Sequence, residues 1–280
     1  MAEGNKAMQE NWETASGAKW VRVADEMDRR LERIGALLLE RAAAQPGERV
    51  LDVGCGGGAT TRLLADAVTP GGSVVGLDIS EAMLGVARAR LEGRPEAALV
   101  RGDAEDHAFA PPPFDLVASR FGVMFFADPV RAFRNIRGAM RAGARLCFVC
   151  WAPLAENPSW RIPFEIAVRH LGPPATKPPH APGPMAFDDP DYVRGLLGAA
   201  GFRGVVVKRE ATEVPGRASA AKEAEFAVLM GPAAAHIGEV GASEDAVAAI
   251  REEVEAAIAP RATPAGIVTP ATVFVVTATA

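Results

Sequence analysis

The sequence has little of what marks secreted, membrane-spanning or nucleic-acid-binding proteins. It contains three cysteines in 280 residues, and its formal net charge of -5 argues against a nucleic-acid partner, which would require clustered Lys and Arg. No apolar run approaches the roughly 20 residues that span a bilayer. The start, Met1-Ala-Glu-Gly-Asn-Lys6, lacks a basic region followed by an apolar core, so no secretory signal is expected. We therefore expect a cytoplasmic protein with no membrane or nucleic-acid partner.

What the sequence does contain is the glycine-rich segment Val50-Leu-Asp-Val-Gly-Cys-Gly-Gly-Gly58. The apolar run predicts a buried strand, and Gly54, Gly56 and Gly58 allow the backbone to turn sharply and to approach a ligand closely. Residues 59–68 follow with helical apolar spacing, so free N–H groups at the helix start would face an anionic or polar group. Strand, turn and helix predict the first unit of a doubly wound α/β sheet.

The residue before the glycines narrows the choice of ligand. Gly54-x-Gly56-x-x-Ala59 also satisfies the dinucleotide fingerprint, so a nicotinamide-dependent oxidoreductase is an alternative. However, Asp52 stands two residues before the first glycine, and a carboxylate there suits a ligand that carries an ammonium better than one that carries a pyrophosphate. S-adenosylmethionine is such a ligand.

Acidic residues also end the next two predicted strands. Strand 73–78 ends in Asp78, about 20 residues past the last glycine, where an acid that binds ribose hydroxyls is expected. Strand 97–101 leads to Asp103, which could accept a hydrogen bond from an exocyclic amine such as that of adenine. Two more strands are predicted at 114–119 and 144–150, and Asp128 is predicted to cap a helix.

Together these segments resemble class I S-adenosylmethionine-dependent methyltransferases, in particular the small-molecule branch with the ubiquinone and menaquinone methyltransferases. The resemblance rests on five stretches in order and spacing over about residues 46 to 152: Val50–Gly58, Gly76-Leu-Asp-Ile-Ser80, Gly102-Asp-Ala104, Phe114-Asp-Leu-Val-Ala-Ser119 and Met140-Arg-Ala-Gly-Ala-Arg145. It implies a Rossmann-like doubly wound seven-stranded sheet with helices on both faces and the last strand antiparallel.

The resemblance also implies the cofactor site. Asp52 would lie by the methionine amine, Asp78 would hold the ribose, and Asp103 and Ala104 would meet the adenine of S-adenosylmethionine, with S-adenosylhomocysteine as product. The remaining residues expected to bind cofactor are Trp20, Gly54, Cys55, Gly56, Gly58, Ile79, Met83, Gly102 and Ser119. The chain departs from the family at Gly57, where Thr is frequent, and at His107, where an apolar residue is common.

The organisation expected is a single methyltransferase domain over 1–280. Its parts are a helical cap at 1–45 that the resemblance places over the cofactor, the cofactor-binding core at 46–152, a proline-rich lid or substrate loop at 153–189, and the C-terminal part of the sheet at 190–280. Helical patterns near 218–230 and 244–258 predict a helical insertion at about 211–269. A sixth strand is predicted at 205–209, and the resemblance implies that the final strand, 272–278, enters antiparallel beside the fifth and sixth strands.

The chemistry expected is methyl transfer to a small, apolar or aromatic molecule, because a sulfonium methyl is already electrophilic and needs mainly an aligned nucleophile. The catalytic candidates are His107, Arg120 and His170, and the substrate-binding candidates are Arg120, Phe121, Met124 and Trp151. Arg120 is expected to hold a carboxylate or incipient oxyanion. No metal is expected, because Cys147 and Cys150 lie three apart in a strand and point to opposite faces. A protein that binds the cofactor without methylating is a further alternative, and a homodimer is one option for its assembly.

Overall fold

The computed structural model describes residues 10, 12, 13 and 15–280, and the other residues of the predicted N-terminal cap lie outside this set. Within these residues, no helix is both long and apolar enough to cross a bilayer. The chain divides into two compact units, which are described separately. The first comprises Met1–Trp151, His180–Glu210 and Val273–Ala280, and the second comprises Ala152–Pro179 and Ala211–Thr272.

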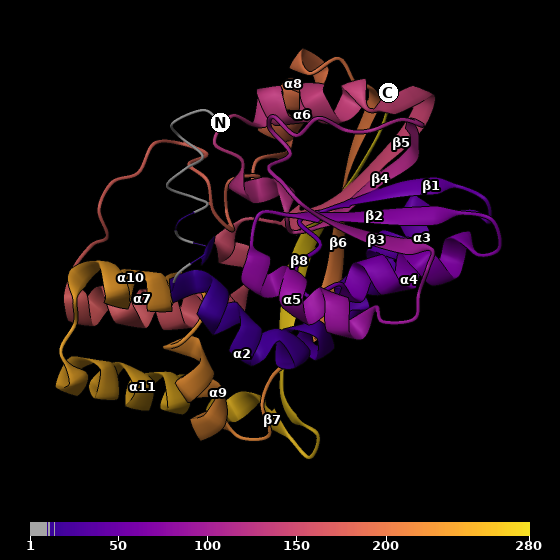
Figure 1. Cartoon of the computed structure of the whole chain (residues 1–280). Helices are drawn as coiled ribbons and strands as arrows, with labels where there is room; N and C mark the ends of the chain where they lie inside the picture. Colours follow the sequence, from indigo (N-terminus) through magenta and orange to yellow (C-terminus); the bar gives the residue numbers. More distant parts are fainter. Residues whose placement is uncertain (1–9, 11, 14) are drawn as a thin grey trace. The chain divides into compact units, whose positions relative to one another are not determined.

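The first unit is built around a twisted sheet with the strand order β3-β2-β1-β4-β5-β8-β6 (Figure 1). Parallel pairing joins β1 to β2 and β4, β2 to β3, and β4 to β5, whereas β8 runs antiparallel to β5. This confirms the predicted doubly wound sheet of seven strands with an antiparallel last strand. The strands are β1 (Arg49–Val53), β2 (Ser73–Asp78), β3 (Ala97–Arg101), β4 (Phe114–Arg120), β5 (Met140–Trp151), β6 (Arg203–Pro215) and β8 (Gly266–Thr279).

Helices cover both faces of this sheet. Nearly all residues of β1, β4 and the end of β5 are therefore buried, as their mostly apolar side chains require. Cys147 faces the Leu38 carbonyl on one side, and Cys150 faces the Phe187 carbonyl on the other, so the predicted opposite orientation of the two thiols is confirmed. The helices of the first unit are α2 (Ala15–Arg30), α3 (Glu32–Ala42), α4 (Ala59–Val68), α5 (Glu81–Arg90), the 3-10 turn η1 (Val123–Phe125), α6 (Pro129–Gly138) and α8 (Pro190–Ala199).

Helix starts in this unit follow the capping chemistry of the sequence. Ser80, Asp128 and Asp189 each accept a hydrogen bond from a backbone N–H in the first turn of α5, α6 and α8, respectively. Asp128 therefore has the structural role predicted for it. The two helices predicted in residues 10–44 are confirmed as α2 and α3.

The second unit is helical and has its own apolar core. Its elements are η2 (Leu154–Glu156), α7 (Pro158–Leu171), α9 (Ala220–Ala227), α10 (Pro232–Val240), α11 (Glu244–Ile258), η3 (Ala259–Arg261) and β7 (Ala262–Thr263), the last paired with the start of β8. The core joins residues of α7, α9, α10 and α11, among them Ile166, Ala224, Ala233, Ile250 and Val254. The helical insertion is confirmed near 218–230 and 244–258, and α10 was not predicted.

The prediction of a proline-rich loop over 153–189 is wrong for its first half, where residues 158–171 form α7. Pro158 occupies the first position of this helix, where no intrahelical N–H bond is lost, and Pro163 is the only proline inside it. The denser run of prolines falls after Gly172, in a stretch without helix or strand. A lid or substrate role for that remaining stretch stays a prediction.

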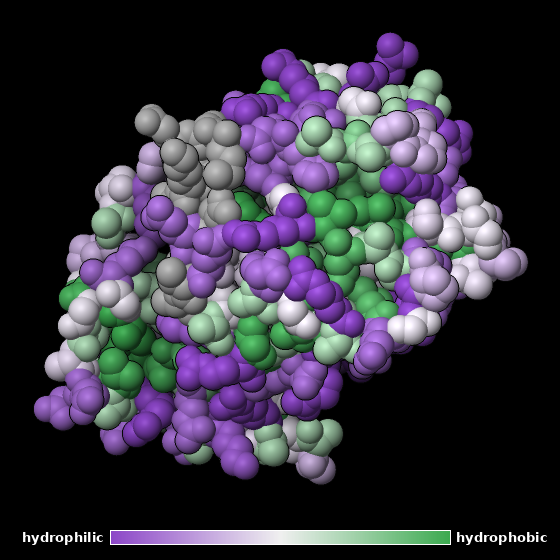
Figure 2. All heavy atoms as spheres, in the orientation of Figure 1, coloured by the Kyte–Doolittle hydropathy of each residue, from purple (hydrophilic) through white to green (hydrophobic). Residues whose placement is uncertain are grey.

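Polar and apolar side chains alternate over the visible surface (Figure 2). Among the described residues, the large hydrophobic side chains that are exposed are Val21, Val206 and Val240. Since these belong to three different elements, the described surface shows isolated exposed valines, which are ordinary for a folded protein.

Asn157 holds together the segments by which the chain enters and leaves the second unit. Its fully buried amide donates to the carbonyls of Ala152, Pro153 and Thr272 at 3.0, 3.2 and 3.1 Å, and its oxygen accepts from the Thr272 N–H at 3.0 Å. Every hydrogen-bonding site of this amide except one oxygen lone pair is therefore used.

We expect Asn157→Ala to lower the free energy of unfolding by about 3 kcal/mol, because it removes the partner of the Thr272 N–H and of the Ala152 carbonyl. The Pro153 and Thr272 carbonyls keep the N–H groups of Glu156 and Ala152 as donors. Urea unfolding followed by circular dichroism would measure this loss. Lys177→Ala, which removes an exposed ion pair with Glu239 in the same unit, serves as the control and should change stability by less than about 0.5 kcal/mol. A loss of similar size in both variants would contradict the role given to Asn157.

Candidate cofactor site

The glycine turn lies between the ends of three parallel strands. Gly54 and Gly58 have φ values of +68° and +80°, a conformation that favours glycine, and Gly58 begins helix α4. The Gly54 N–H donates to the Leu77 carbonyl at the end of β2, at 2.8 Å. A Cβ on Gly54 would lie 2.6 Å from the Cα of Gly122, which follows β4. The turn is thus packed against the loop after β4 with no room for a side chain.

Asp52 places a carboxylate beneath this turn. The residue is fully buried, and its Oδ2 accepts a hydrogen bond from the Thr61 hydroxyl at 2.7 Å, while Oδ1 has no hydrogen-bond partner within the described part of the chain. Burial raises the pKa of Asp52 to about 6, because the charged form loses solvation, although the Thr61 hydrogen bond and the charge of Arg120 favour that form. A cationic ligand beside Oδ1 would supply the missing partner.

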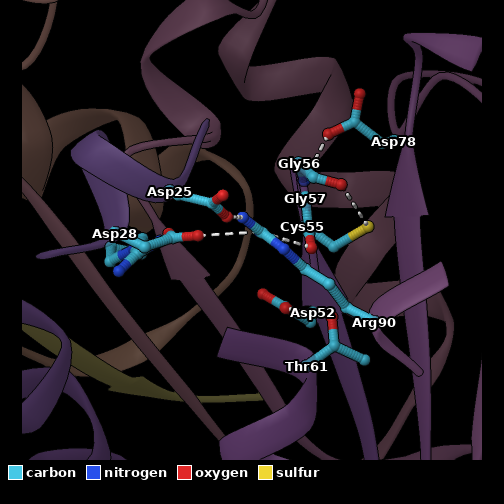
Figure 3. A network of polar contacts seen from close by, with 10 residues as sticks. Asp25, Asp28, Asp52, Cys55, Gly56, Gly57, Thr61, Asp78 and Arg90 are labelled. Carbon is cyan, nitrogen blue, oxygen red and sulfur yellow. Dashed lines mark hydrogen bonds and ion pairs between the residues drawn. The ribbon is translucent and has the colours of Figure 1, made fainter. Parts of the chain in front are cut away.

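Asp78 joins the glycine turn to the start of α5. Its Oδ2 accepts from the Gly56 N–H at 2.7 Å (Figure 3). Its Oδ1 accepts from the Ser80 N–H at 2.8 Å. Burial raises the pKa of Asp78, although these backbone hydrogen bonds act in the opposite direction. Each carboxylate oxygen keeps a second lone pair, so the group can still accept from two hydroxyls of a ligand.

The third acidic position follows β3. Asp103 Oδ1 accepts from the Glu105 N–H at 2.9 Å, and Ala104 is buried with its carbonyl accepting from the Asn135 amide at 3.0 Å. Gly102 is required by packing, since a Cβ there would lie 2.6 Å from Nδ1 of His107. Asp52, Asp78 and Asp103 thus follow three adjacent parallel strands at the same edge of the sheet.

Known proteins resemble this chain over the segment that carries these residues. A family model described as a methyltransferase domain matches residues 51–148. The chain is also 31% identical over 166 residues to 2-phytyl-1,4-naphtoquinone methyltransferase from Thermosynechococcus vestitus, an alignment that covers 57% of this chain and 74% of that protein. The chain belongs to the class I S-adenosylmethionine-dependent methyltransferases.

Other similarities agree with this membership. The methyltransferase is 34% identical over 176 residues to nocamycin O-methyltransferase from Saccharothrix syringae, covering 59% of this chain and 62% of that one, and other curated relatives are matched over as little as 32% of their length. The crystal structure of YcgJ from Bacillus subtilis superposes with a TM-score of 0.57 at 16% identity, covering 89% of this chain and 98% of that one. This last likeness shows the fold alone.

Three further residues predicted to bind the cofactor, Cys55, Ile79 and Met83, lie within the glycine turn or beside the residues that contact it. Met83 is buried in α5, with its Cε 3.6 Å from the point where a Cβ of Gly56 would be, and Ile79 lies between Asp78 and Ser80. Cys55 is buried within the turn, and burial raises the pKa of its thiol well above the usual range. Whether these residues touch the cofactor stays a prediction.

The hydroxyl of Ser119, another predicted cofactor residue, already makes two hydrogen bonds within the protein. It is completely buried, donates to the Val53 carbonyl at 2.7 Å and accepts from the Gly122 N–H at 3.1 Å. These bonds join the ends of β1 and β4. The structure therefore gives the Ser119 hydroxyl a positioning role, and the cofactor contact predicted for Ser119 stays a prediction.

We expect Gly122→Ala to lower the free energy of unfolding by about 1–3 kcal/mol, because its Cβ would lie 2.5 Å from the Val53 carbonyl oxygen and 2.7 Å from the Gly54 Cα. Displacement of Gly54 should also weaken S-adenosylhomocysteine binding, measurable by calorimetry alongside a thermal melt. Gly85→Ala, in open space on α5, is the control and should be neutral or slightly stabilising. Unchanged affinity in Gly122→Ala would show that the turn tolerates the shift.

Tryptophans of the N-terminal region lie near the same strand ends. Trp12 contacts Trp20 of α2, with ring centroids 5.9 Å apart, and packs edge-on against Phe125 of η1 at 5.6 Å. The Ser80 hydroxyl donates to the Trp12 carbonyl at 3.2 Å. Trp20 is therefore placed close to the predicted cofactor site, while direct contact stays a prediction.

The substrate-side candidates form two groups. Phe121 has a φ of +66° and stacks on Trp151 with ring centroids 4.5 Å apart, so the ends of β4 and β5 carry a pair of parallel aromatic rings. Met124 is only 1% exposed, which favours packing over substrate contact. Arg120 donates to Asp28 Oδ1 at 2.6 Å, so its charge is already paired with a carboxylate. This pairing weakens the prediction that Arg120 holds an anionic substrate group.

The histidine candidates are held by other partners. His107 packs edge-on against Phe109, with centroids 4.9 Å apart, and its carbonyl accepts from Asn135. His170 belongs to the second unit, where its Nε2 lies 2.7 Å from a carboxylate oxygen of Glu253. These are the contacts that the structure gives for His107 and His170, and the catalytic roles of both histidines stay predictions. No cluster of metal-ligating side chains occurs among the residues described.

Sequence reasoning missed Glu105 and Asn135. Buried Glu105 accepts from the N–H groups of Ala127 and Asp128 at 2.6 and 3.0 Å, and burial raises the pKa of its carboxyl. Asn135 of α6 donates to the carbonyls of Ala104 and His107. Both side chains fix the loops after β3 and β4. The sequence signals Glu105 only as an acidic residue two positions after Asp103. Its hydrogen-bond partners, Ala127 and Asp128, lie more than 20 residues further along the chain, so their contact could not be predicted.

Proposed function

We propose that this methyltransferase transfers the methyl group of S-adenosylmethionine to a small apolar or aromatic molecule by in-line displacement, with S-adenosylhomocysteine as product. The observation that carries the proposal is Asp52, a buried carboxylate whose Oδ1 has no partner in the described residues and which lies beneath a glycine turn. A ligand with an ammonium group fits this atom, whereas the pyrophosphate of a nicotinamide dinucleotide would be repelled by it.

In this proposal, the residues of the chain bind and orient the methyl donor. Asp52 would accept from the amino group of the donor, Asp78 from its ribose hydroxyls and Asp103 from the adenine amine, which fixes the donor at both ends. The bound donor supplies an electrophilic methyl group. Because burial raises the pKa of the Cys55 thiol, this sulfur stays protonated at neutral pH and does not compete as a nucleophile.

The acceptor class follows from the aromatic pair at the strand ends. Phe121 is partly exposed and stacks on the buried Trp151, so it offers an apolar ring where open α/β sheets bind ligands. Arg120 brings no net charge there because Asp28 neutralises it. The names of the two relatives refer to a naphthoquinone and to nocamycin. These features support an apolar, ring-containing acceptor, and they assign no general base.

The proposal also covers location and assembly. A cytoplasmic location is supported by the three cysteines, which are free buried thiols. The acidic net charge supports a small-molecule rather than a nucleic-acid partner. Light scattering of the purified protein would decide between a monomer and the homodimer considered from the sequence.

Calorimetry with S-adenosylmethionine, S-adenosylhomocysteine and NADH tests the cofactor. We expect micromolar binding of the first two and none of NADH. Transfer of a radiolabelled methyl group to a panel of hydroxynaphthoquinones, phenols and aliphatic amines then tests the reaction. Binding of the donor without transfer to any acceptor, in the panel or in a metabolite extract, would favour the alternative of a cofactor-binding protein that does not methylate.

A further inference from the structure

One aspartate of α2 bridges two arginines that come from different parts of the first unit. Asp28 Oδ2 accepts from Nη1 of Arg90, the last residue of α5, at 2.8 Å, and Asp28 Oδ1 accepts from Nη2 of Arg120, the last residue of β4, at 2.6 Å. Arg90 also pairs with Asp25, one turn earlier on α2. Two carboxylates and two guanidinium groups therefore form a neutral set that ties α2 to α5 and β4.

Arg90 also contacts the glycine turn itself. Its Nη1 donates to the Gly57 carbonyl at 2.8 Å, so one guanidinium joins the turn to the carboxylates of α2 (Figure 3). A Cβ on Gly57 would lie only 2.5 Å from this nitrogen. Unlike Gly54, Gly56 and Gly58, Gly57 has no positive φ, so its backbone does not call for glycine. The missing side chain at this position instead makes room for Arg90.

The chain just before α2 reaches the same edge of the sheet. The Trp12 carbonyl accepts from Ser80 after β2, and the Trp12 ring packs on Phe125 after β4. Trp12 and Asp28 are thus held at the ends of β2 and β4, on either side of β1 and its glycine turn. Because Asp52 is completely buried, a donor with an ammonium group can reach its Oδ1 only after surrounding residues have moved.

We propose that Arg90 is a positioning residue for the cofactor, and that Gly57, Arg90, Asp28 and Arg120 form an ionic latch, called here the α2 latch. Formation of the latch holds α2 over the glycine turn and fixes the turn through the Gly57 carbonyl. Opening it lets the donor enter and the product leave. This inference rests on the proposed function, since it concerns retention of S-adenosylmethionine and S-adenosylhomocysteine.

The test uses two variants that break the latch in different ways. Arg90→Gln removes the guanidinium, whereas Gly57→Ala displaces it without removing any charged group from the protein. We expect each variant to raise the dissociation constant of S-adenosylhomocysteine about tenfold, mainly through faster release in stopped-flow tryptophan fluorescence. The KM for the donor should rise similarly, while kcat changes less than twofold.

Three controls separate the latch from a general loss of structure. Arg88→Gln, which removes an exposed pair with Glu81 on the same helix, should leave affinity unchanged. The melting temperature of each variant should stay within a few degrees of the wild type. The double variant Asp28→Asn/Arg90→Gln should bind no more weakly than the weaker single variant, because both changes break one coupled set.

The outcomes distinguish the two levels of the proposal. If the wild type does not bind the donor or its product, the proposed function fails. If the wild type binds but Arg90→Gln and Gly57→Ala stay within twofold of it, or Arg88→Gln weakens binding equally, the latch is refuted while the function stands.

Discussion

Asp52→Asn is expected to weaken S-adenosylmethionine binding by about a hundredfold or more, because it removes the charge that would pair with the donor's ammonium in a site without solvent. Asn keeps the size of the side chain and an acceptor for the Thr61 hydroxyl, so the turn should retain its shape. Isothermal titration at pH 8 measures the loss. Asp66→Asn, which changes an exposed carboxylate on α4, is the matched control and should bind normally.

The same substitution has a signature in the stability of the unliganded protein. The pKa of Asp52 is raised from 3.8 to about 6 by burial, so the folded state binds this proton more tightly than the unfolded chain does. Between about pH 4 and pH 7 the wild type therefore loses stability as the pH rises through the two pKa values, and the loss is complete above about pH 7. Asn does not titrate.

The difference in unfolding free energy should thus shift by about 2 kcal/mol in favour of the variant from pH 4 to pH 7. Any constant cost of burying the amide cancels in this comparison. Urea unfolding at several pH values, without ligand, measures it. A difference that stays flat over this range would mean that Asp52 is solvated or paired in the free protein.

Asp78→Ala is expected to have the second-largest effect, again about a hundredfold on donor affinity, because it removes two charge-assisted hydrogen bonds expected to the ribose and releases the Gly56 and Ser80 N–H groups. Asp78→Asn keeps one acceptor oxygen and should fall between Ala and the wild type. Calorimetry with S-adenosylhomocysteine measures both.

A fragment of the donor separates the two aspartates. 5′-Methylthioadenosine carries the adenosine part but no amino group, so Asp52→Asn should bind it like the wild type, whereas Asp78→Ala should bind it more weakly. Equal losses in the two variants would contradict the assignment of Asp52 to the amine and Asp78 to the ribose.

Residues that act within a few positions of one another could be predicted from the sequence. The strand, glycine turn and helix around Asp52, and the caps at Ser80, Asp128 and Asp189, depend on local backbone geometry and on hydrogen bonds across two or three residues. The opposite orientation of Cys147 and Cys150 follows from the two-residue period of a strand. The predicted loop at 153–189 was wrong over α7, because the number of prolines says less than their positions: Pro158 stands at the helix start, where a helix tolerates it.

The sequence by itself thus determined the parallel sheet, the order of the acidic strand ends and the family, because these are written in short-range patterns. Only the tertiary structure decided that Arg120 is paired with Asp28, that Ser119 joins two strands, and that Gly57 makes room for Arg90. Each of these contacts joins residues more than 30 positions apart. Their partners are chosen by how helices pack on the sheet, and no local period in the sequence encodes that choice.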